Sequence, residues 1–280
     1  MPRNATYLFG RLNIIAMETD KSAIYSKAFS QSAPSVRRYA HTWGFSDVEV
    51  LRDEELGDFF EGFLVKYKDQ QAVEVVDTDA KALVDENVRN LVAAHARFFL
   101  HPSTGLIAYH PVGTEISGPT FIARFGELVE QALDRFFVSA EILPINDTET
   151  WQQALNRFSR IDRLKIYLHP SNPSNRHLWK RIDERLRGMH VKSYREEYQG
   201  STADGGLRPN ADRSIGRKIA MAEDGYGYAE VVGVRDGKEG TLSTRDRPLT
   251  SQAPNDSESP EVVLRALKDI FCSILKRFQK

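Results

Sequence analysis

The sequence repeats one phrase, Leu-His-Pro-Ser, in FFLHPSTG at residues 98–105 and in IYLHPSN at residues 166–172. In the first copy, Pro and Gly separate the apolar runs 92–100 and 106–110, which predicts a β-hairpin. In the second copy, the apolar run 164–168 predicts a strand followed by a helix. A further strand-like run, 138–145, lies between the copies. We therefore expect a sheet protein with helices rather than a helical bundle.

The clearest predicted helix covers residues 120–137, where apolar residues recur with a period of 3.6. Its stripe includes Phe121, Phe125 and Leu128, and Pro119 suits the start of a helix. Burial stabilises such a stripe by roughly 1.5–3 kcal/mol per large side chain, so we expect this helix in the core.

Two more helices are predicted towards the C-terminus. One follows IYLHPSN, with Asn172 as cap, Pro173 in its first turn, Gly188 at its end and a basic exposed face. The last helix starts at Pro260 and has a wide apolar face. That face predicts core packing, with pairing to a second copy of the chain as the alternative.

These patterns predict an α+β fold with mixed or mainly antiparallel sheets, because strands do not alternate strictly with helices. We place an N-terminal α+β lobe at 1–145 and a C-terminal α+β lobe at 146–280, the latter containing the basic helix and the terminal helix. Within the first lobe, residues 77–91 are predicted to contain an acidic helical or turn segment.

The composition is that of an ordinary globular protein, with 280 residues and a formal net charge of −1. Charge is nevertheless segregated, since residues 151–220 hold 15 Lys and Arg against 7 Asp and Glu. The single cysteine, Cys272, excludes an intramolecular disulfide. No apolar run suits a membrane span and no leader is evident, so we expect a cytoplasmic protein. No metal or cofactor motif is recognised.

The twin phrases suggest one enzymatic interpretation. His101 with Ser103, and His169 with Ser171, match the bare His-x-Ser pattern of two-histidine phosphoesterases, which act on nucleotides or RNA. One imidazole would serve as general base and the other as general acid, while the hydroxyls hold phosphate. However, proline fills the middle position in both copies. The competing interpretation is that both phrases are turns at strand ends.

The basic segment supports a different interpretation, contact with the phosphates of DNA. Lysine and arginine supply such affinity without reading the base sequence. The candidate contacts are Arg176, Lys180, Arg181, Arg185, Arg187, Lys192, Arg195, Arg217 and Lys218.

The order of elements also resembles that of the RexA family of phage-exclusion proteins. The resemblance rests on LHPSTGLIAYHP at 100–111, AEILPI at 140–145, LKIYLHPS at 164–171, GKEGTLST at 237–244 and the terminal KRFQK. It implies a DNA-binding sensor in antiphage defence that forms a homodimer on DNA. It transfers no functional residue to this sequence.

Our leading interpretation is therefore a non-enzymatic, sequence-independent DNA-binding protein of antiphage defence, acting as a homodimer with a possible protein effector partner. The phosphoesterase is the first alternative. A protein-binding module that acts through the C-terminal helix is the second.

Overall fold

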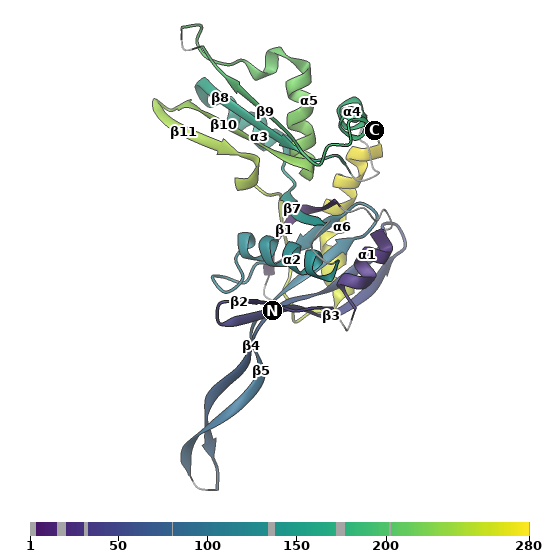
Figure 1. Cartoon of the computed structure of the whole chain (residues 1–280), viewed down its shortest axis with the longest axis vertical. Coiled ribbons are helices and arrows are strands. Elements are labelled where there is room, and N and C mark those ends of the chain that lie inside the picture. Colours follow the sequence, from purple (N-terminus) through teal and green to yellow (C-terminus); the bar gives the residue numbers. More distant parts are fainter. Residues whose placement is uncertain are drawn as a thin grey trace.

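The computed structural model describes residues 4–15, 21–30, 33–79, 81–133, 138–171, 177–201 and 203–279. It shows an α+β fold built on two antiparallel sheets, which confirms the predicted fold class (Figure 1). The first sheet has the strand order β12-β1-β6-β5-β4-β3-β2, and β7 also pairs with β1. Its strands are β1 (Asn4–Ile15), β2 (Val36–Arg38), β3 (His41–Asp53), β4 (Gly57–Asp77), β5 (Ala82–His101), β6 (Leu106–Tyr109), β7 (Ser139–Pro144) and β12 (Thr250–Pro254).

The predicted hairpin around FFLHPSTG is present as β5 and β6. The two strands pair in antiparallel register from Phe98 opposite Tyr109 to His101 opposite Leu106. Gly105 lies in the turn with φ of +71°, and a Cβ there would come within 2.5 Å of the Leu12 carbonyl oxygen. Only glycine therefore fits between this turn and β1.

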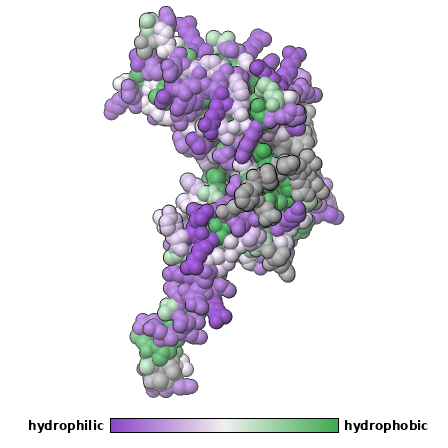
Figure 2. Space-filling view, viewed as in Figure 1, coloured by the Kyte–Doolittle hydropathy of each residue, from purple (hydrophilic) through white to green (hydrophobic). Residues whose placement is uncertain are grey.

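Strands β4 and β5 continue beyond the sheet as a two-stranded arm (Figure 1). The segment 77–91, predicted to contain an acidic helix or turn, has a turn at residues 78–79, but residues from Ala82 onward pair with β4 and form no helix. Apolar surface is visible towards the end of the arm in Figure 2, where Val76, Leu83 and Val84 are exposed. Cross-strand pairing, which the single sequence does not reveal, overrides the local pattern.

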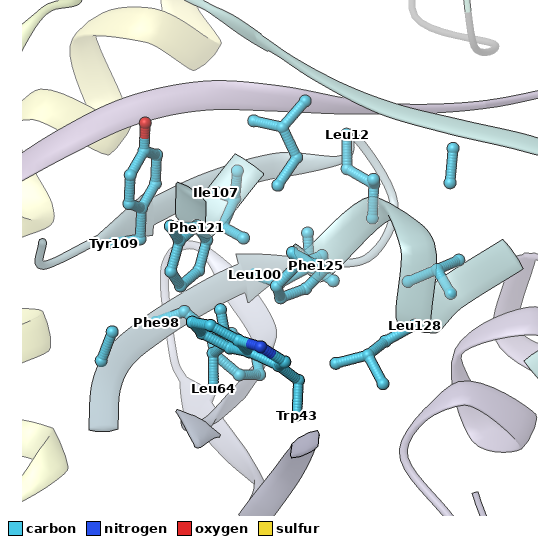
Figure 3. Packing of buried hydrophobic residues seen from close by; sticks show 14 of the residues in the cluster. Leu12, Trp43, Leu64, Phe98, Leu100, Ile107, Tyr109, Phe121, Phe125 and Leu128 are labelled. Carbon is cyan, nitrogen blue, oxygen red and sulfur yellow. The ribbon is translucent and has the colours of Figure 1, made fainter. Parts of the chain in front are cut away.

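Helices cover both faces of the first sheet. The core on one face contains residues of α1 (Lys21–Ala28) and α2 (Gly118–Ala132). Figure 3 shows Phe121 and Phe125 of α2 packed over Phe98 and Leu100 of β5. The rings of Phe98 and Phe125 meet edge to face at 5.1 Å, a favoured aromatic geometry. The stripe predicted for this helix is thus confirmed as core.

The opposite face of the first sheet carries α6 (Pro260–Gln279). Phe271 of this helix is fully buried and contacts the rings of Phe9 and Phe59. Strand β12 pairs with β1 beside it. The chain from β12 onward therefore belongs with the N-terminal sheet, which corrects the placement of the terminal helix in a C-terminal lobe. Because its apolar face is core, the helix does not offer that face to a partner.

The second sheet has the order β11-β10-β8-β9. Three helices share one of its faces, since Trp151, Leu186 and Ile219 join the same buried cluster as Leu164 and Val231. Alternate residues of each strand point to the opposite face. The strands are β8 (Phe158–Leu168), β9 (Tyr194–Gln199), β10 (Gly227–Arg235) and β11 (Lys238–Ser243), and the helices are α3 (Thr148–Leu155), α4 (Lys180–Gly188) and α5 (Arg213–Met221).

The start of α2 provides a test of local stabilisation. The Ser117 hydroxyl accepts a hydrogen bond from the Thr120 backbone N–H at 3.3 Å and caps the helix. Ser117→Ala removes this acceptor, and we expect the free energy of unfolding to fall by about 1 kcal/mol. Urea denaturation measures this change, and Ser117→Asp, which restores an acceptor, should recover most of the loss. An unchanged midpoint for Ser117→Ala would show that the cap contributes nothing.

Candidate nucleic-acid interface

A basic groove lies between α4 and α5, on the helix-covered side of the second sheet. It encloses about 290 Å³. Four of the residues that line it are cationic: Arg181, Arg185, Arg217 and Lys218. The remaining described lining residues are Ile182, Leu186, Met189, Tyr194 and Ser214, none of them acidic. We call this set the α4/α5 groove.

Helix periodicity places Arg181 and Arg185 side by side in the groove. They are four residues apart, so they lie on the same face of α4 one turn from each other. Leu186 on the adjacent face is buried and anchors the helix on the sheet. Both arginines are exposed, and within the described residues neither forms an ion pair. Their guanidinium groups are thus free to contact a ligand.

Helix α5 contributes the opposite wall. The Asp212 carboxylate caps it by accepting from the Ser214 N–H at 2.7 Å. Ile215 and Ile219 are buried against the sheet, which leaves Arg217 exposed towards the groove. Asp212 itself lies at the helix start, outside the groove lining.

Among the described residues, Lys218 is the groove cation that has a carboxylate partner. Its ammonium donates to Glu196 of β9 and lies 5.6 Å from the Tyr194 ring centre. Partial burial alone would lower the pKa of Lys218, but the hydrogen bond to Glu196 outweighs it and the pKa is raised. Lys218 therefore remains charged at neutral pH, while Glu196 offsets part of its field.

The structure gathers only part of the predicted phosphate-binding set in the groove. Lys180 lines an adjoining hollow with Arg181 and Arg217, and lies 3.8 Å from Glu184. Lys192 is exposed outside the groove. Arg195 lies on the opposite face of the sheet, over the Tyr167 ring. Arg176, together with the predicted cap Asn172 and Pro173, lies outside the described residues, and α4 is described from Lys180.

Arg187, another predicted phosphate contact, does not line the groove. Its Nε lies 2.8 Å from Asp183, and its guanidinium also donates to the Ser171 carbonyl and hydroxyl oxygens. Asp183 is fully buried although it belongs to the helix predicted to be basic. Arg187 therefore neutralises a buried carboxylate instead of offering its charge to a ligand.

The first His-Pro-Ser phrase forms a closed structural turn. His101 Nε2 donates to the Leu56 carbonyl oxygen at 2.9 Å, while Nδ1 lies 2.7 Å from the Thr104 hydroxyl. Burial lowers the pKa of His101, which keeps the imidazole neutral. Ser103 lies 3.4 Å from Nδ1 of the same ring. Both ring nitrogens are thus occupied by the protein.

The second phrase lies in the other sheet. His169 Nε2 lies 3.1 Å from Glu141 and Nδ1 lies 3.3 Å from the Lys192 carbonyl oxygen. The Ser171 hydroxyl donates to buried Asp183 at 2.8 Å. The described residues place the two histidines at separate strand ends, each with its own partners. This arrangement favours the turn interpretation of the phrases.

Sequence reasoning missed a cluster of buried charges where the two sheets meet. Arg11 of β1 donates to the Asp224 carbonyl oxygen at 2.8 Å and to that of Thr104 at 2.5 Å. Asp224 accepts from the Trp179 indole N–H at 2.8 Å. It belongs to a π-helical turn, Ala222–Tyr226, whose five residues are all buried. The signal available was Arg11 itself, a charge within an otherwise apolar strand.

The described residues contain no group of three or more His, Cys, Asp or Glu arranged to hold a metal ion. Nor does any helix in the described part of the chain combine the length and apolar character needed to cross a membrane.

Comparison with curated proteins gave no match. A family model does match, and it covers residues 5–275, which include both sheets, the α4/α5 groove and most of α6. The chain therefore belongs to the DUF4747 family, a domain of unknown function.

Proposed function

We propose that this protein binds DNA without reading its base sequence, through the α4/α5 groove. The observation that carries the proposal is the convergence of four cations from two helices on one groove with no acidic lining residue among those described. Three of them, Arg181, Arg185 and Arg217, are exposed. A groove of this kind suits a polyanion, because its charges are concentrated while the whole chain is nearly neutral.

The chemistry of the groove favours phosphate over base edges. Arginine guanidinium groups donate paired hydrogen bonds that match phosphate oxygens, and lysine supplies a point charge. Ile182, Leu186 and Met189 provide apolar surface between the cations, which can contact sugars without distinguishing bases. The groove therefore supports affinity for the backbone rather than sequence readout.

The test is a fluorescence-anisotropy titration of the full chain with two labelled duplexes of unrelated sequence. We expect equal affinities for both, with a salt dependence set by the number of phosphates contacted. Four contacts give a slope of roughly −3.6 for the logarithm of the association constant against the logarithm of salt concentration. Affinity should thus fall about 150-fold between 50 and 200 mM salt.

Binding that ignores salt would contradict the proposal, because it would show that counterion release is not involved. A strong preference for one of the two duplexes would contradict sequence independence. An unrelated acidic polymer, heparin, should compete with DNA, since the proposed contacts recognise charge.

A role in antiphage defence, as a homodimer with an effector partner, extends this proposal. Its support is the resemblance to RexA-type proteins, in the strand-turn-strand and C-terminal helix segments quoted above. Light scattering of the chain with and without duplex DNA tests the homodimer, and a mass of one chain under both conditions would refute it.

A further inference from the structure

A row of four side chains crosses the face of the second sheet opposite α3, α4 and α5. Arg195 of β9 is the register partner of Tyr167 on β8, which is the register partner of Tyr228 on β10. Arg245, just after β11, completes the row on the far side of Tyr228. We call these residues the Arg-Tyr-Tyr-Arg row.

The members of the row contact each other in order. The two tyrosine rings are 5.1 Å apart with an interplanar angle of 34°. The Arg195 guanidinium carbon lies 5.1 Å from the centre of the Tyr167 ring, and that of Arg245 lies 3.9 Å from the centre of the Tyr228 ring. Adjacent strands are about 4.8 Å apart, so the row extends over about 14 Å.

The row is accessible to a ligand. Both arginines are exposed and both tyrosines are half-buried. A hollow of about 360 Å³ lies over this part of the sheet. Its lining includes Tyr167, Tyr228, Arg195 and Lys165, together with Glu196 and Glu197 of β9. His169 lies beside the row, two residues further along the chain from Tyr167, and its ring meets the Tyr167 ring edge to face.

Charge next to the row defines where a polyanion would lie. The adjacent row of the sheet contains Glu197, Lys165 and Glu230, which are register partners across β9, β8 and β10. Its two carboxylates disfavour phosphates along the length of the strands. The cations at the two ends of the Arg-Tyr-Tyr-Arg row instead favour a chain that follows the row across the strands.

We propose that the Arg-Tyr-Tyr-Arg row binds single-stranded nucleic acid. The guanidinium groups of Arg195 and Arg245 move from the tyrosine rings to phosphates, and bases take their place on Tyr167 and Tyr228. A duplex hides the faces of its bases within its own stack, whereas a single strand presents them to aromatic rings and guanidinium planes. The inference rests on the proposed DNA binding and deepens it, because it names the single-stranded form as the ligand of a second surface. Strand β9 joins the two surfaces, since Tyr194 faces the groove and Arg195 the row.

The experiment compares a labelled oligothymidine, an abasic strand of equal length and a duplex, each titrated against the full chain. The variants are Tyr167→Ala/Tyr228→Ala and, as a matched control, Tyr167→Phe/Tyr228→Phe. Stacking of a base on each tyrosine is expected to raise the affinity about tenfold. The affinity of the alanine pair for oligothymidine should therefore be about 100-fold lower than that of the unaltered protein. Duplex affinity should stay within about twofold, because the α4/α5 groove is intact. The phenylalanine pair should bind oligothymidine as the unaltered protein does.

The arms separate the possible failures. If the unaltered protein binds the abasic strand as tightly as oligothymidine, stacking is refuted while backbone binding stands. If the alanine pair keeps full affinity for oligothymidine, the row is refuted and the groove proposal again stands. Failure to bind any of the three probes overturns both proposals. Thermal melting monitors the folded state, and the abasic comparison on unaltered protein decides the question if the alanine pair does not fold.

Discussion

Charge reversal of Arg181 and Arg185 together, by Arg181→Glu/Arg185→Glu, is expected to weaken DNA binding about 100-fold at moderate salt. Each arginine would lose a charge-assisted hydrogen bond to phosphate, which contributes about 1.5 kcal/mol, and about 1.4 kcal/mol corresponds to a factor of ten. The two new carboxylates would also repel the DNA backbone. Because both side chains are exposed, the fold should be unaffected. Anisotropy titration with duplex DNA measures the change.

The matched control is Arg89→Glu/Arg265→Glu, which changes the net charge by the same amount. Arg89 is exposed on the β4–β5 arm and Arg265 is exposed on α6, both outside the groove. Equal losses in the two double variants would mean that overall charge, and not the groove, attracts DNA. The groove variant should also reduce the slope of the salt dependence by the amount expected for about two phosphate contacts. The control should leave that slope unchanged.

Arg11→Ala is expected to lower the free energy of unfolding by about 2–6 kcal/mol, because it leaves two buried carbonyl oxygens without a donor, at about 1–3 kcal/mol each. Arg11 is completely buried and its guanidinium lies 4.5 Å from the centre of the Tyr226 ring. The substitution takes the donors away from the carbonyl oxygens of Thr104 and Asp224. Thr104 lies in the turn between β5 and β6 of the first sheet, and Asp224 lies in the turn before β10 of the second sheet. The variant should therefore also loosen the contact between the two sheets.

Urea denaturation measures the loss, and Arg11→Lys provides a graded comparison. Lysine keeps the charge but cannot place two donors in the planar geometry of a guanidinium, so we expect partial retention of stability. The control is Arg52→Ala, which removes an exposed ion pair with Asp58 and should leave the unfolding midpoint unchanged. If Arg11→Ala behaves like Arg52→Ala, the buried cluster does not hold the sheets together.

Several elements were predictable because their signals are local. The stripe of Phe121, Phe125 and Leu128 repeats at the helix period, and α2 is the helix it predicts. Pro and Gly at short spacing after His101 predict a turn, and β5 and β6 pair on either side of that turn. The strand from Ala82 onward was not predicted, because this acidic segment becomes a strand only where β4 supplies its hydrogen-bonding partner.

The candidate site was only partly predictable for the same reason. Arg181 and Arg185 are one helical turn apart, so their shared face follows from spacing alone. Their meeting with Arg217 and Lys218 depends on how α4 and α5 pack on the sheet. Arg187 could not be placed from the sequence. It lies four residues from Asp183 on the same helix, and it donates hydrogen bonds to that buried carboxylate and to the Ser171 hydroxyl.

Periodicity, turn residues and net charge along the chain were enough to identify the α+β class, the helices α2, α4 and α6, the first hairpin and the basic segment. They act within a few residues, so they are visible in one sequence. The placement of α6 on the N-terminal sheet, the buried cluster at Arg11 and the Arg-Tyr-Tyr-Arg row depend on contacts between residues far apart in the chain. Such contacts arise because apolar faces and buried polar groups must each find a complementary partner, and that partner is settled when the whole chain packs.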